Sequence, residues 1–455
     1  MNRLIVIIFF TLYSKGFTQS QCFTIGADMS YTNSILSKGG IYRDSNRNIT
    51  DPYALFAQKG ANMARIRLWH TPENNIDKCG NPISTNNLDD VVLAFKKAKT
   101  NGMKLNLSIH YGDYFNDPGN QKMPKAWMGL SQSVLLDSIY NYTYTVLKRL
   151  NKEGVTPDIV AIGNETTWGF INETTPTNGW IWPNDADKFN IAFTSVDNFN
   201  KANGTSIKKA VHFTDTTAAW LTGLFYTKSV RNFDLIGISF YPHFSNFSSL
   251  QQLGSLITQL KSTYNKEIMI FETGAPWTNT AYADSYGNFV GNNGNFNYPI
   301  TPQGQKSFLF DLAQTVYNAG GTGILYWEPA WISSGMCDLW GQGSSYENMS
   351  FFDFQNGNKP LPAFDIFNFC SSLSLPTKNS NKDKVFIFPN PASSKVEIIG
   401  LKQDVAIKIT DFLGRIVKNT FSKNNTVDIS DMPVGVYTIR MFINNQLDSK
   451  KFIKI

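Results

Sequence analysis

Two glutamates in the chain each follow a short apolar run, where a carboxylate could take part in catalysis. Glu165 comes directly after the residues DIVAIGN, and Glu272 comes directly after EIMIF. Two carboxylates that face each other across a cleft can break a glycosidic bond, because one protonates the leaving oxygen while the other attacks the anomeric carbon. The alternative interpretation is that both glutamates form ordinary surface ion pairs.

The neighbours of the two glutamates suggest how each could hold the protonation state that it needs. We expect Arg67 and a hydrogen bond from the phenol of Tyr241 to keep Glu272 ionised for attack. The negative charge of Glu272 would raise the pKa of Glu165, which must carry a proton in the first step. Arg67 could instead neutralise another acid at the mouth of the site, and Tyr241 could serve only in core packing.

Three further residues have the chemistry to hold a sugar. Asn164 can hydrogen-bond a sugar 2-hydroxyl, and Trp327 can stack against the apolar C–H face of a sugar ring. His110 is as well suited to a structural hydrogen bond as to substrate contact. The four histidines of the chain form no HxH or HExxH pair, which argues against a zinc hydrolase.

Eight short apolar runs between residues 22 and 372 are the elements that would position these side chains. The runs are Phe23–Ala27, Met63–Trp69, Lys104–Ile109, Asp158–Gly163, Ile207–Phe213, Leu235–Tyr241, Glu267–Phe271 and Gly323–Trp327. Continuous apolarity is typical of strands buried on both faces of a parallel sheet. Amphipathic stretches alternate with them, so the pattern predicts an α/β fold, a (β/α)8 TIM barrel. A doubly wound sheet is the alternative, but no glycine-rich phosphate loop follows the first run.

The carboxyl ends of barrel strands are where catalytic groups are expected. Polar or aromatic residues stand at every one of these ends: Asp28, Arg65, Arg67, Trp69, His70, His110, Tyr111, Asp113, Asn164, Glu165, His212, Ser239, Tyr241, Glu272, Trp327 and Glu328. Glu165 ends the fourth strand and Glu272 the seventh. Their side chains can therefore face across one cavity.

The composition changes near residue 373. Residues 373–384 are polar and without period, which is typical of a linker. Alternating strands then follow at Lys395–Ile399, Val405–Thr410, Val436–Phe442 and Lys451–Ile455, with turn residues between them. We therefore expect residues 21–372 to form the barrel and residues 385–455 to form a small all-β, sandwich-like domain.

The first twenty residues have the pattern of a secretory signal peptide. Arg3 precedes an apolar run from Leu4 to Leu12, and small side chains precede a cut after Ser20. A buried N-terminal strand is the alternative, and Gln21 before Cys22 does not suit lipoprotein processing. No other segment is apolar over the length that a bilayer requires. We expect a secreted or cell-surface protein, in which Cys22, Cys79, Cys337 and Cys370 allow three disulfide pairings.

The net charge of +6 is not spread evenly along the chain. Residues 1–20 and 373–384 carry +2 each and residues 385–455 carry +4, which leaves −2 for residues 21–372. No basic stripe remains in the main body to follow a phosphate backbone. Nucleic acid is therefore excluded as a partner, and the main body suits an uncharged one.

Eight sequence motifs in the main body together resemble glycoside hydrolase family 53, the endo-β-1,4-galactanases. They are GADMSYTNSI (26–35), GANMARIRLWHTP (60–72), HYGDYFNDPGNQ (110–121), PDIVAIGNE (157–165), DLIGISFYP (234–242), IFETGAPWT (270–278), LYWEPAWI (325–332) and FFDFQNGNKPLPAF (351–364). The resemblance implies a clan A barrel that cuts the β-1,4-galactan side chains of pectin internally and with retention. The substrate would be an uncharged polysaccharide, in agreement with the charge of the main body.

The resemblance also implies roles for individual residues. Glu165 corresponds to the acid/base and Glu272 to the nucleophile. The residues expected to bind the substrate are Arg67, His110, Asp113, Tyr114, Phe115, Asn116, Asn164, Tyr241, His243, Trp327 and Trp331. Bacterial members of the family often carry a calcium loop after the nucleophile strand, but here Asp284 and Asn288 are the only plausible oxygen ligands. We therefore expect no cofactor and no metal, with calcium as the alternative.

The final segment resembles the C-terminal sorting domain of the type IX secretion system of Bacteroidetes. The matching pieces are PNPASS (389–394), ITDFLGRIV (409–417), MPVGVYTIRM (432–441) and the ending SKKFIKI. The resemblance implies export across the outer membrane, with the secretion machinery as partner and the tail removed on the way. The alternative is a small carbohydrate-binding or accessory domain.

Other functions remain open at this stage. The chain could be another retaining clan A glycanase, such as a mannanase or cellulase. It could also be a surface glycan-binding protein with an inactive barrel, although both glutamates are present, or a structural adhesin that depends on neither. In each case we expect a monomer.

Overall fold

The computed structural model describes residues 23–173, 180–280, 296–344, 346–370, 385–401, 404–411, 414–443 and 446–455. The chain divides into two compact units, with the division after residue 373. The predicted leader peptide (1–20) and the predicted linker (373–384) lie outside the described residues.

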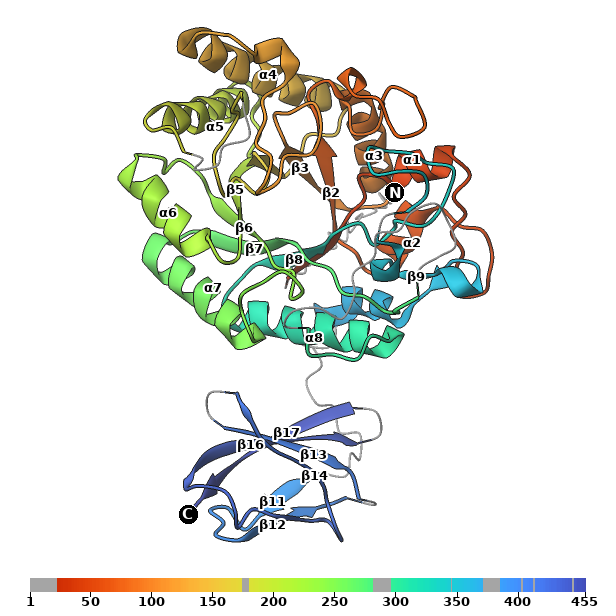
Figure 1. The fold of residues 1–455 in the computed structure, drawn as a ribbon, viewed down its shortest axis with the longest axis vertical. Coiled ribbons are helices and arrows are strands. Elements are labelled where there is room, and N and C mark those ends of the chain that lie inside the picture. Colours follow the sequence, from red (N-terminus) through yellow and green to blue (C-terminus); the bar gives the residue numbers. More distant parts are fainter. Residues whose placement is uncertain are drawn as a thin grey trace, which may run out of the picture. The chain divides into compact units, whose positions relative to one another are not determined.

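The first unit is a closed barrel of eight parallel strands, hydrogen-bonded in the order of the sequence, with β1 beside β8 (Figure 1). The strands are β1 (Thr24–Asp28), β2 (Met63–Leu68), β3 (Lys104–Ile109), β4 (Ile159–Ile162), β5 (Lys208–Thr214), β6 (Leu235–Ser239), β7 (Glu267–Glu272) and β8 (Gly323–Tyr326). All eight predicted strands are present, and the (β/α)8 barrel is confirmed.

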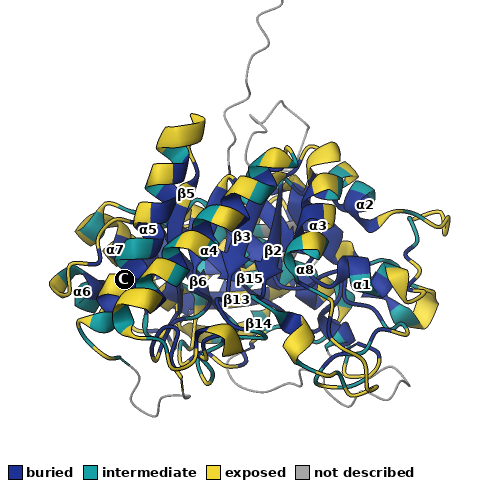
Figure 2. Cartoon of the chain, turned by 90° about the horizontal axis from the view of Figure 1, so that it is seen from above, coloured by how far each residue is buried: buried dark blue, intermediate teal, exposed yellow. Residues whose placement is uncertain are grey.

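Helices surround the barrel, with buried residues towards the strands and exposed residues on the outside (Figure 2). They are α1 (Thr32–Ser37), α2 (Pro52–Gln58), α3 (Leu88–Thr100), α4 (Gln132–Lys152), α5 (Asn184–Asn203), α6 (Ala218–Thr227), α7 (Leu250–Tyr264) and α8 (Pro302–Asn318). A short pair of strands, β9 (Phe352–Asp353) and β10 (Lys359–Pro360), and a 3-10 helix (Pro362–Asn368) complete this unit. The continuous apolar runs form the strands, and the amphipathic stretches between them form the helices.

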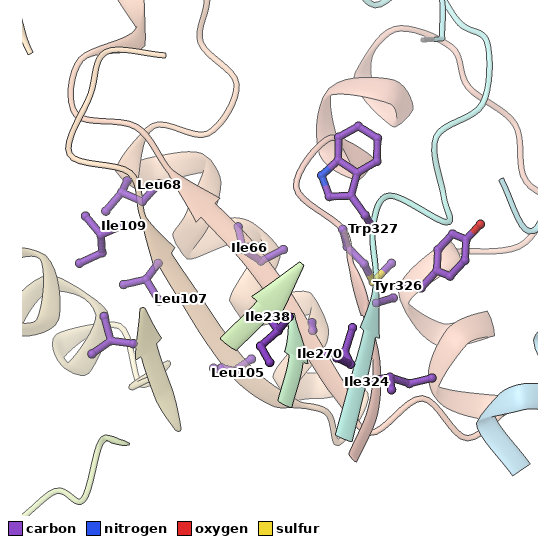
Figure 3. Close-up of a cluster of buried hydrophobic side chains, with 14 of the residues drawn as sticks. Ile66, Leu68, Leu105, Leu107, Ile109, Ile238, Ile270, Ile324, Tyr326 and Trp327 are labelled. Atoms are coloured by element: carbon purple, nitrogen blue, oxygen red, sulfur yellow. The ribbon is translucent and has the colours of Figure 1, made fainter. Parts of the chain in front are cut away.

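The apolar side chains of the barrel form two separate cores, because successive residues of a strand point to opposite faces. One face packs against the helices and includes Ile66, Leu107, Ile238, Ile270 and Ile324 (Figure 3). The other face fills the barrel interior with a smaller group: Met63, Ile159, Ala161, Ala210, Leu235, Met269, Phe271 and Leu325. Strands covered on both sides therefore have near-continuous apolar sequences.

One glycine makes room for the largest side chain of the barrel interior. A Cβ atom on Gly237 would lie 2.2 Å from a ring carbon of Phe271 on the neighbouring strand. Glycine at this position lets the Phe271 ring lie within the barrel, where it contacts His212 with ring centroids 5.3 Å apart. This contact is the boundary between the apolar interior and the polar layer above it.

The second unit consists of two antiparallel sheets. One sheet has the order β11 (Phe386–Phe388), β12 (Lys395–Ile399), β15 (Thr426–Asp428), and the other has the order β14 (Ile416–Phe421), β13 (Ala406–Asp411), β16 (Gly435–Ile443), β17 (Gln446–Lys454). The two sheets share one apolar core, to which Val396, Ile407 and Ile439 contribute fully buried side chains. The predicted all-β C-terminal domain is confirmed.

A disulfide joins Cys79 to Cys337, which lie 258 residues apart in the sequence and belong to the loops after β2 and β8. Of the three possible pairings, those that would join Cys79 to another cysteine are thus excluded. None of the described helices combines the length and the apolar character needed to cross a bilayer.

Candidate active site

A cavity of about 570 Å³ opens at the carboxyl ends of the barrel strands. It is lined from the loops that follow strands β3 to β8, by residues that include Phe115, Asn164, Glu165, Trp168, Tyr241, Glu272, Trp327, Trp340 and Tyr346. Both glutamates that the sequence singled out therefore face one space. The volume is in the range of pockets that bind small organic ligands.

A β-bulge at the end of β7 turns Glu272 towards the cavity. By strict alternation, Met269 and Phe271 point into the barrel, so Glu272 would point to the helices. The β6–β7 register shifts at this point, so that Ile238 pairs with Ile270 but Ser239 pairs with Glu272. Bulges commonly re-aim a side chain next to an active site. Here the extra residue leaves Phe271 in the interior and brings Glu272 to the cavity wall.

Glu272 is buried and held by two donors. Nη2 of Arg65 lies 2.8 Å from Oε1 of Glu272, and the Tyr241 phenol donates a hydrogen bond of 2.9 Å to Oε2. Burial raises the pKa of Glu272, whereas the Arg65 charge and the Tyr241 hydrogen bond act in the opposite direction. The two donors fix both carboxylate oxygens and favour the ionised form.

Arg65 is the cation paired with Glu272, whereas the sequence indicated Arg67; the charge of Arg67 also lowers the pKa of Glu272, but without a direct ion pair. Arg67 instead forms a buried ion pair with Glu328, and its guanidinium lies 4.7 Å from the ring centre of Tyr31. Arg65 also binds Asp28, with 2.5 Å between Nη1 and Oδ2. The two arginines are two residues apart on β2, so their side chains point to the same face of the strand. Arg65 pairs with Glu272 and Arg67 pairs with Glu328.

Glu165 stands on a strained turn at the end of β4. Its backbone is in the left-handed region with φ 43°, and Gly163 two residues earlier has φ 80°. Non-glycine residues rarely adopt this region, and such strain is often found at functional sites. Nε2 of Gln121 donates hydrogen bonds to the carbonyl oxygens of Asn164 (2.9 Å) and Glu165 (3.2 Å). These bonds hold the turn that presents Glu165 to the cavity.

The electrostatic surroundings of Glu165 differ from those of Glu272. In the described part of the chain, no lysine, arginine or histidine forms an ion pair with Glu165. Burial, followed by the charge of Glu272, raises the pKa of Glu165 to about 8. At neutral pH one carboxyl group of the cavity thus holds a proton while the other is paired with a cation.

A series of hydrogen bonds runs from Arg65, the partner of Glu272, to Ser239 on the wall of the same cavity. Oδ1 of Asn164 accepts from Nη2 of Arg65 at 2.8 Å and lies 3.0 Å from Nδ1 of His212. Nε2 of the same imidazole lies 2.9 Å from the Ser239 hydroxyl.

The donor and the acceptor of each of these hydrogen bonds can be assigned from Arg65 onwards. Because the arginine can only donate, the Asn164 oxygen is the acceptor, and Nδ1 of His212 must be the protonated nitrogen. Nε2 then accepts from Ser239. Burial and the Arg65 charge lower the pKa of His212 well below its usual value, which keeps the imidazole neutral.

The segment 110–121 supports the site more than it lines it. Of the expected substrate-binding residues in this segment, only Phe115 faces the cavity. Asp113 accepts hydrogen bonds from the backbone N–H groups of Thr71 (3.1 Å) and Lys125 (3.0 Å) and so ties loops together. The backbone N–H of Asn116 donates to Nδ1 of His110 (3.1 Å). The backbone carbonyl of Asn116 accepts from Nδ2 of Asn164 (2.8 Å).

Tyr114 of this segment, and also Trp331 and His243, pack away from the cavity, although the sequence predicted that they bind the substrate. Tyr114 packs on Trp69 with ring centroids 4.5 Å apart. Trp331 is buried between Tyr31 and Trp340. His243 is buried against the ring of Phe296, and burial lowers its pKa to about 4. Asp284 and Asn288, the possible calcium ligands, lie outside the described residues.

An aromatic wall forms one side of the cavity, and the sequence indicated only part of it. Trp327 lies there as expected, together with Phe115, Trp340 and Tyr346. Trp340 stacks on Phe115 with ring centroids 5.1 Å apart and planes inclined by 18°. Sequence reasoning missed Trp340 and Tyr346, because they lie well beyond the end of β8. The residues GMCDLWGQG around Trp340 are typical of a loop and give no functional signal of their own.

The described residues of the cavity wall carry acids, hydroxyls and aromatic rings but include no lysine, arginine or histidine. The acids are Asp117, Glu165, Asp215 and Glu272. A polyanion would be repelled by such a wall, whereas a neutral sugar can stack on the rings and bond to the polar groups. Among the described residues, the one group with metal-ligand spacing is Asp77 with Cys79 and Cys337, whose sulfur atoms form the disulfide.

Comparison with known families agrees with the site geometry. The family model "Glycosyl hydrolase family 53" matches residues 24–367. A second model, "Secretion system C-terminal sorting domain", matches residues 386–455. The first match contains the whole barrel and the second contains the whole β unit.

Individual relatives cover most of the first unit. The chain is 37% identical to an arabinogalactan endo-beta-1,4-galactanase of Cellvibrio japonicus, over 79% of this chain and 94% of that protein. It is 31% identical to an endo-beta-1,4-galactanase of Bacillus subtilis, over 78% of this chain and 88% of that protein. Among solved structures, the GH53 catalytic domain of Ignisphaera aggregans matches with a TM-score of 0.68 and 30% identity, over 76% of this chain and 96% of that one.

Proposed function

We propose that this chain, which belongs to glycosyl hydrolase family 53, is a secreted enzyme that cuts β-1,4-galactosidic bonds inside galactan and type I arabinogalactan. The reaction is a double displacement that retains the anomeric configuration. Glu272 is the nucleophile and Glu165 is the acid/base. Two curated relatives that cover about four fifths of the chain carry galactanase names, which supports this choice among the retaining glycanases.

One observation carries the assignment of roles: the two cavity carboxyls have opposite surroundings. Glu272 is bound by a guanidinium and a phenol, whereas Glu165 forms no ion pair with a described cation and has a raised pKa. An ionised carboxylate attacks, and a protonated one donates to the leaving oxygen. Environments that push two carboxyl groups apart in pKa indicate which is acid and which is nucleophile.

In the first step, Glu272 attacks the anomeric carbon while Glu165 protonates the glycosidic oxygen. The bond from the anomeric carbon to that oxygen breaks, and an ester bond to Glu272 forms. Tyr241 and Arg65 hold the attacking carboxylate in place, and Asn164 can bond the sugar 2-hydroxyl as charge develops on the ring. The ring that becomes attached to Glu272 stacks on Trp327.

In the second step, Glu165 acts as a base. It takes a proton from water, the oxygen of which attacks the anomeric carbon and releases Glu272. The negative charge of Glu272 is restored as its ester breaks, and this charge raises the pKa of Glu165 again. The electrostatic coupling of the two groups thus returns the proton to the acid for the next cycle.

The remaining residues of the predicted site have positioning roles in this proposal. Arg67, His110, Asp113, Tyr114, Asn116, His243 and Trp331 support the loops or the buried charges around the cavity. The enzyme acts as a monomer and needs no cofactor. Residues 1–20 act as a leader peptide, residues 21–372 as the catalytic domain and residues 373–384 as a linker, and residues 385–455 direct export through their sorting domain.

The test is incubation of the purified chain with linear β-1,4-galactan, with β-1,4-mannan and cellulose as parallel substrates. We expect short galacto-oligosaccharides at early time points and β-anomeric products by NMR. Cleavage of mannan or cellulose in preference to galactan would identify another glycanase. Binding without cleavage would identify a glycan-binding protein, and early release of monomer or dimer alone would identify an end-acting enzyme.

A further inference from the structure

Two exposed tryptophans follow β4 and β5, which lie across the barrel from β8 and Trp327, and the proposed mechanism uses neither of them. Trp168 lines the cavity and is 44% exposed. Trp220, in the first turn of α6, is 50% exposed. Their ring centroids are 5.9 Å apart, with the planes inclined by 44°. Large apolar side chains that remain exposed side by side usually mark a binding surface.

The position of this pair relative to the two carboxyls defines which part of a substrate it faces. The acid/base stands beside the leaving oxygen, so the sugar that leaves lies on the Glu165 side of the cavity. Trp168 is three residues beyond Glu165 in the same loop. Trp327 follows β8, which pairs with the nucleophile strand β7. The Trp327 side thus faces the sugar that becomes bound to Glu272, and the Trp168 side faces the leaving sugar.

The groups beside the pair have the chemistry of a carbohydrate surface. Thr214, Asp215, Thr216 and Thr217 connect β5 to α6 and line the cavity between Glu165 and the helix that carries Trp220. Hydroxyl and carboxyl groups at the edge of aromatic rings match a sugar, which has apolar C–H faces and a rim of hydroxyls. The same surface is continuous with the cavity that holds the two glutamates.

We propose that Trp168 and Trp220 form a platform for the leaving segment of the galactan chain, on the reducing-end side of the cleaved bond. The platform binds at least one neutral galactosyl ring beyond the cleaved bond and thereby favours cleavage inside the chain. This inference rests on the proposed function. Trp168 contacts the substrate directly, and Trp220 both supports Trp168 and extends the platform along α6.

The test compares two substrates that differ only on the leaving side. Linear β-1,4-galactohexaose can occupy the platform, whereas β-galactobiosyl fluoride leaves as fluoride and cannot reach it. We expect Trp168→Ala to lower kcat/KM on the hexaose about tenfold, the loss of one stacking surface, and to change the rate on the fluoride by less than about twofold. Trp220→Ala gives a smaller loss on the hexaose, and Trp168→Phe restores most of it.

A reducing-end label on the hexaose gives a second readout. In the alanine variants, the enzyme should cut the hexaose at a different bond, because the site binds fewer sugars on the leaving side. Phe421→Ala, an exposed aromatic residue in the C-terminal unit, is the matched control and should match the wild type on both substrates. Equal losses on both substrates, or no loss on the hexaose, would overturn the platform. Failure of the wild type to cut the hexaose would instead overturn the proposed function, and the platform with it.

Discussion

Strand β7 carries a glutamate at each end, and the two residues face cavities of similar size at opposite ends of the barrel. The cavity at the Glu272 end and the cavity at the Glu267 end both measure about 570 Å³. Each glutamate has a cationic partner, Arg65 at 2.8 Å for Glu272 and Lys208 at 2.5 Å for Glu267. Size and ion pairing alone therefore do not separate the two ends.

The surroundings of the two pairs separate them clearly. The side chains of Glu267 and Lys208 are 40% and 46% exposed, so water already solvates both charges. Those of Glu272 and Arg65 are 8% and 0% exposed. Burying two charged groups costs desolvation free energy, so a contribution to stability does not explain why this pair is buried. The cavity at the Glu267 end, called here the lower cavity, is lined by charged residues such as Lys104 and Lys208, by small polar residues and by aliphatic ones such as Met63 and Met269. None of its described lining residues is aromatic. Buried charge beside aromatic rings is thus the signature of function here, and cavity volume is not.

The largest difference is expected when each glutamate of β7 is removed. Glu272→Ala should lower kcat on galactan by at least about 10⁴-fold, because no covalent intermediate can form. Glu267→Ala should leave kcat within about twofold of the wild type. Steady-state kinetics of both variants, with circular dichroism to verify folding, measures the contrast. A comparable loss in Glu267→Ala would mean that the lower end of the barrel also takes part in catalysis.

The second largest effect concerns Glu165, the acid/base in the cavity at the Glu272 end, called here the upper cavity. Glu165→Ala should lower kcat on galactan by about 10²–10⁴-fold. The pKa of about 8 at Glu165 means that the proton needed for catalysis is present below pH 8 and lost above it. The kcat/KM of the wild type should therefore fall as the pH rises through about 8, and Glu165→Gln should lack this fall. If the fall persists in Glu165→Gln, it belongs to Glu328, whose pKa burial also raises to about 8.

Arg65, which pairs with Glu272, and Lys208, which pairs with Glu267, should differ in their contribution to the free energy of unfolding. Arg65→Ala leaves the buried carboxylates of Asp28 and Glu272 without their shared partner, and should lower the free energy of unfolding by about 3–5 kcal/mol. Lys208→Ala opens an exposed pair and should cost only about 0–1 kcal/mol. Urea denaturation followed by tryptophan fluorescence measures both. Equal losses would show that burial does not distinguish the two pairs.

The smallest effect is expected from salt and from a polyanion. Because no cationic side chain is among the described residues on the wall of the upper cavity, KM for galactan should change by less than about twofold between 50 and 500 mM NaCl. Polygalacturonate should neither be cut nor inhibit, since the acids of the wall repel it. Inhibition that salt relieves would place a cationic subsite in the path of the substrate.

The sequence by itself determined the architecture and the positions of the two cavity carboxyls. Strands buried on both faces must be apolar throughout, so all eight are visible as short apolar runs. Residues just beyond those runs must meet at one end of the barrel. Glu165, Glu272, Asn164, Tyr241 and Trp327 follow from that rule, and the structure places all five around one cavity. The C-terminal β domain was equally visible in the sequence, because apolar and polar residues alternate along its strands.

Only the tertiary structure decided which neighbours each of these groups has. Arg65 and Arg67 are both arginines and lie two residues apart on one strand, yet Glu272 pairs with Arg65 and Glu328 pairs with Arg67. Strict alternation would have turned Glu272 to the helices, and a bulge in the β6–β7 register reversed this. Trp340 reaches the cavity from a loop without periodicity. Periodic patterns report local geometry, whereas the pairing of buried charges and the course of loops depend on contacts between segments far apart in the chain.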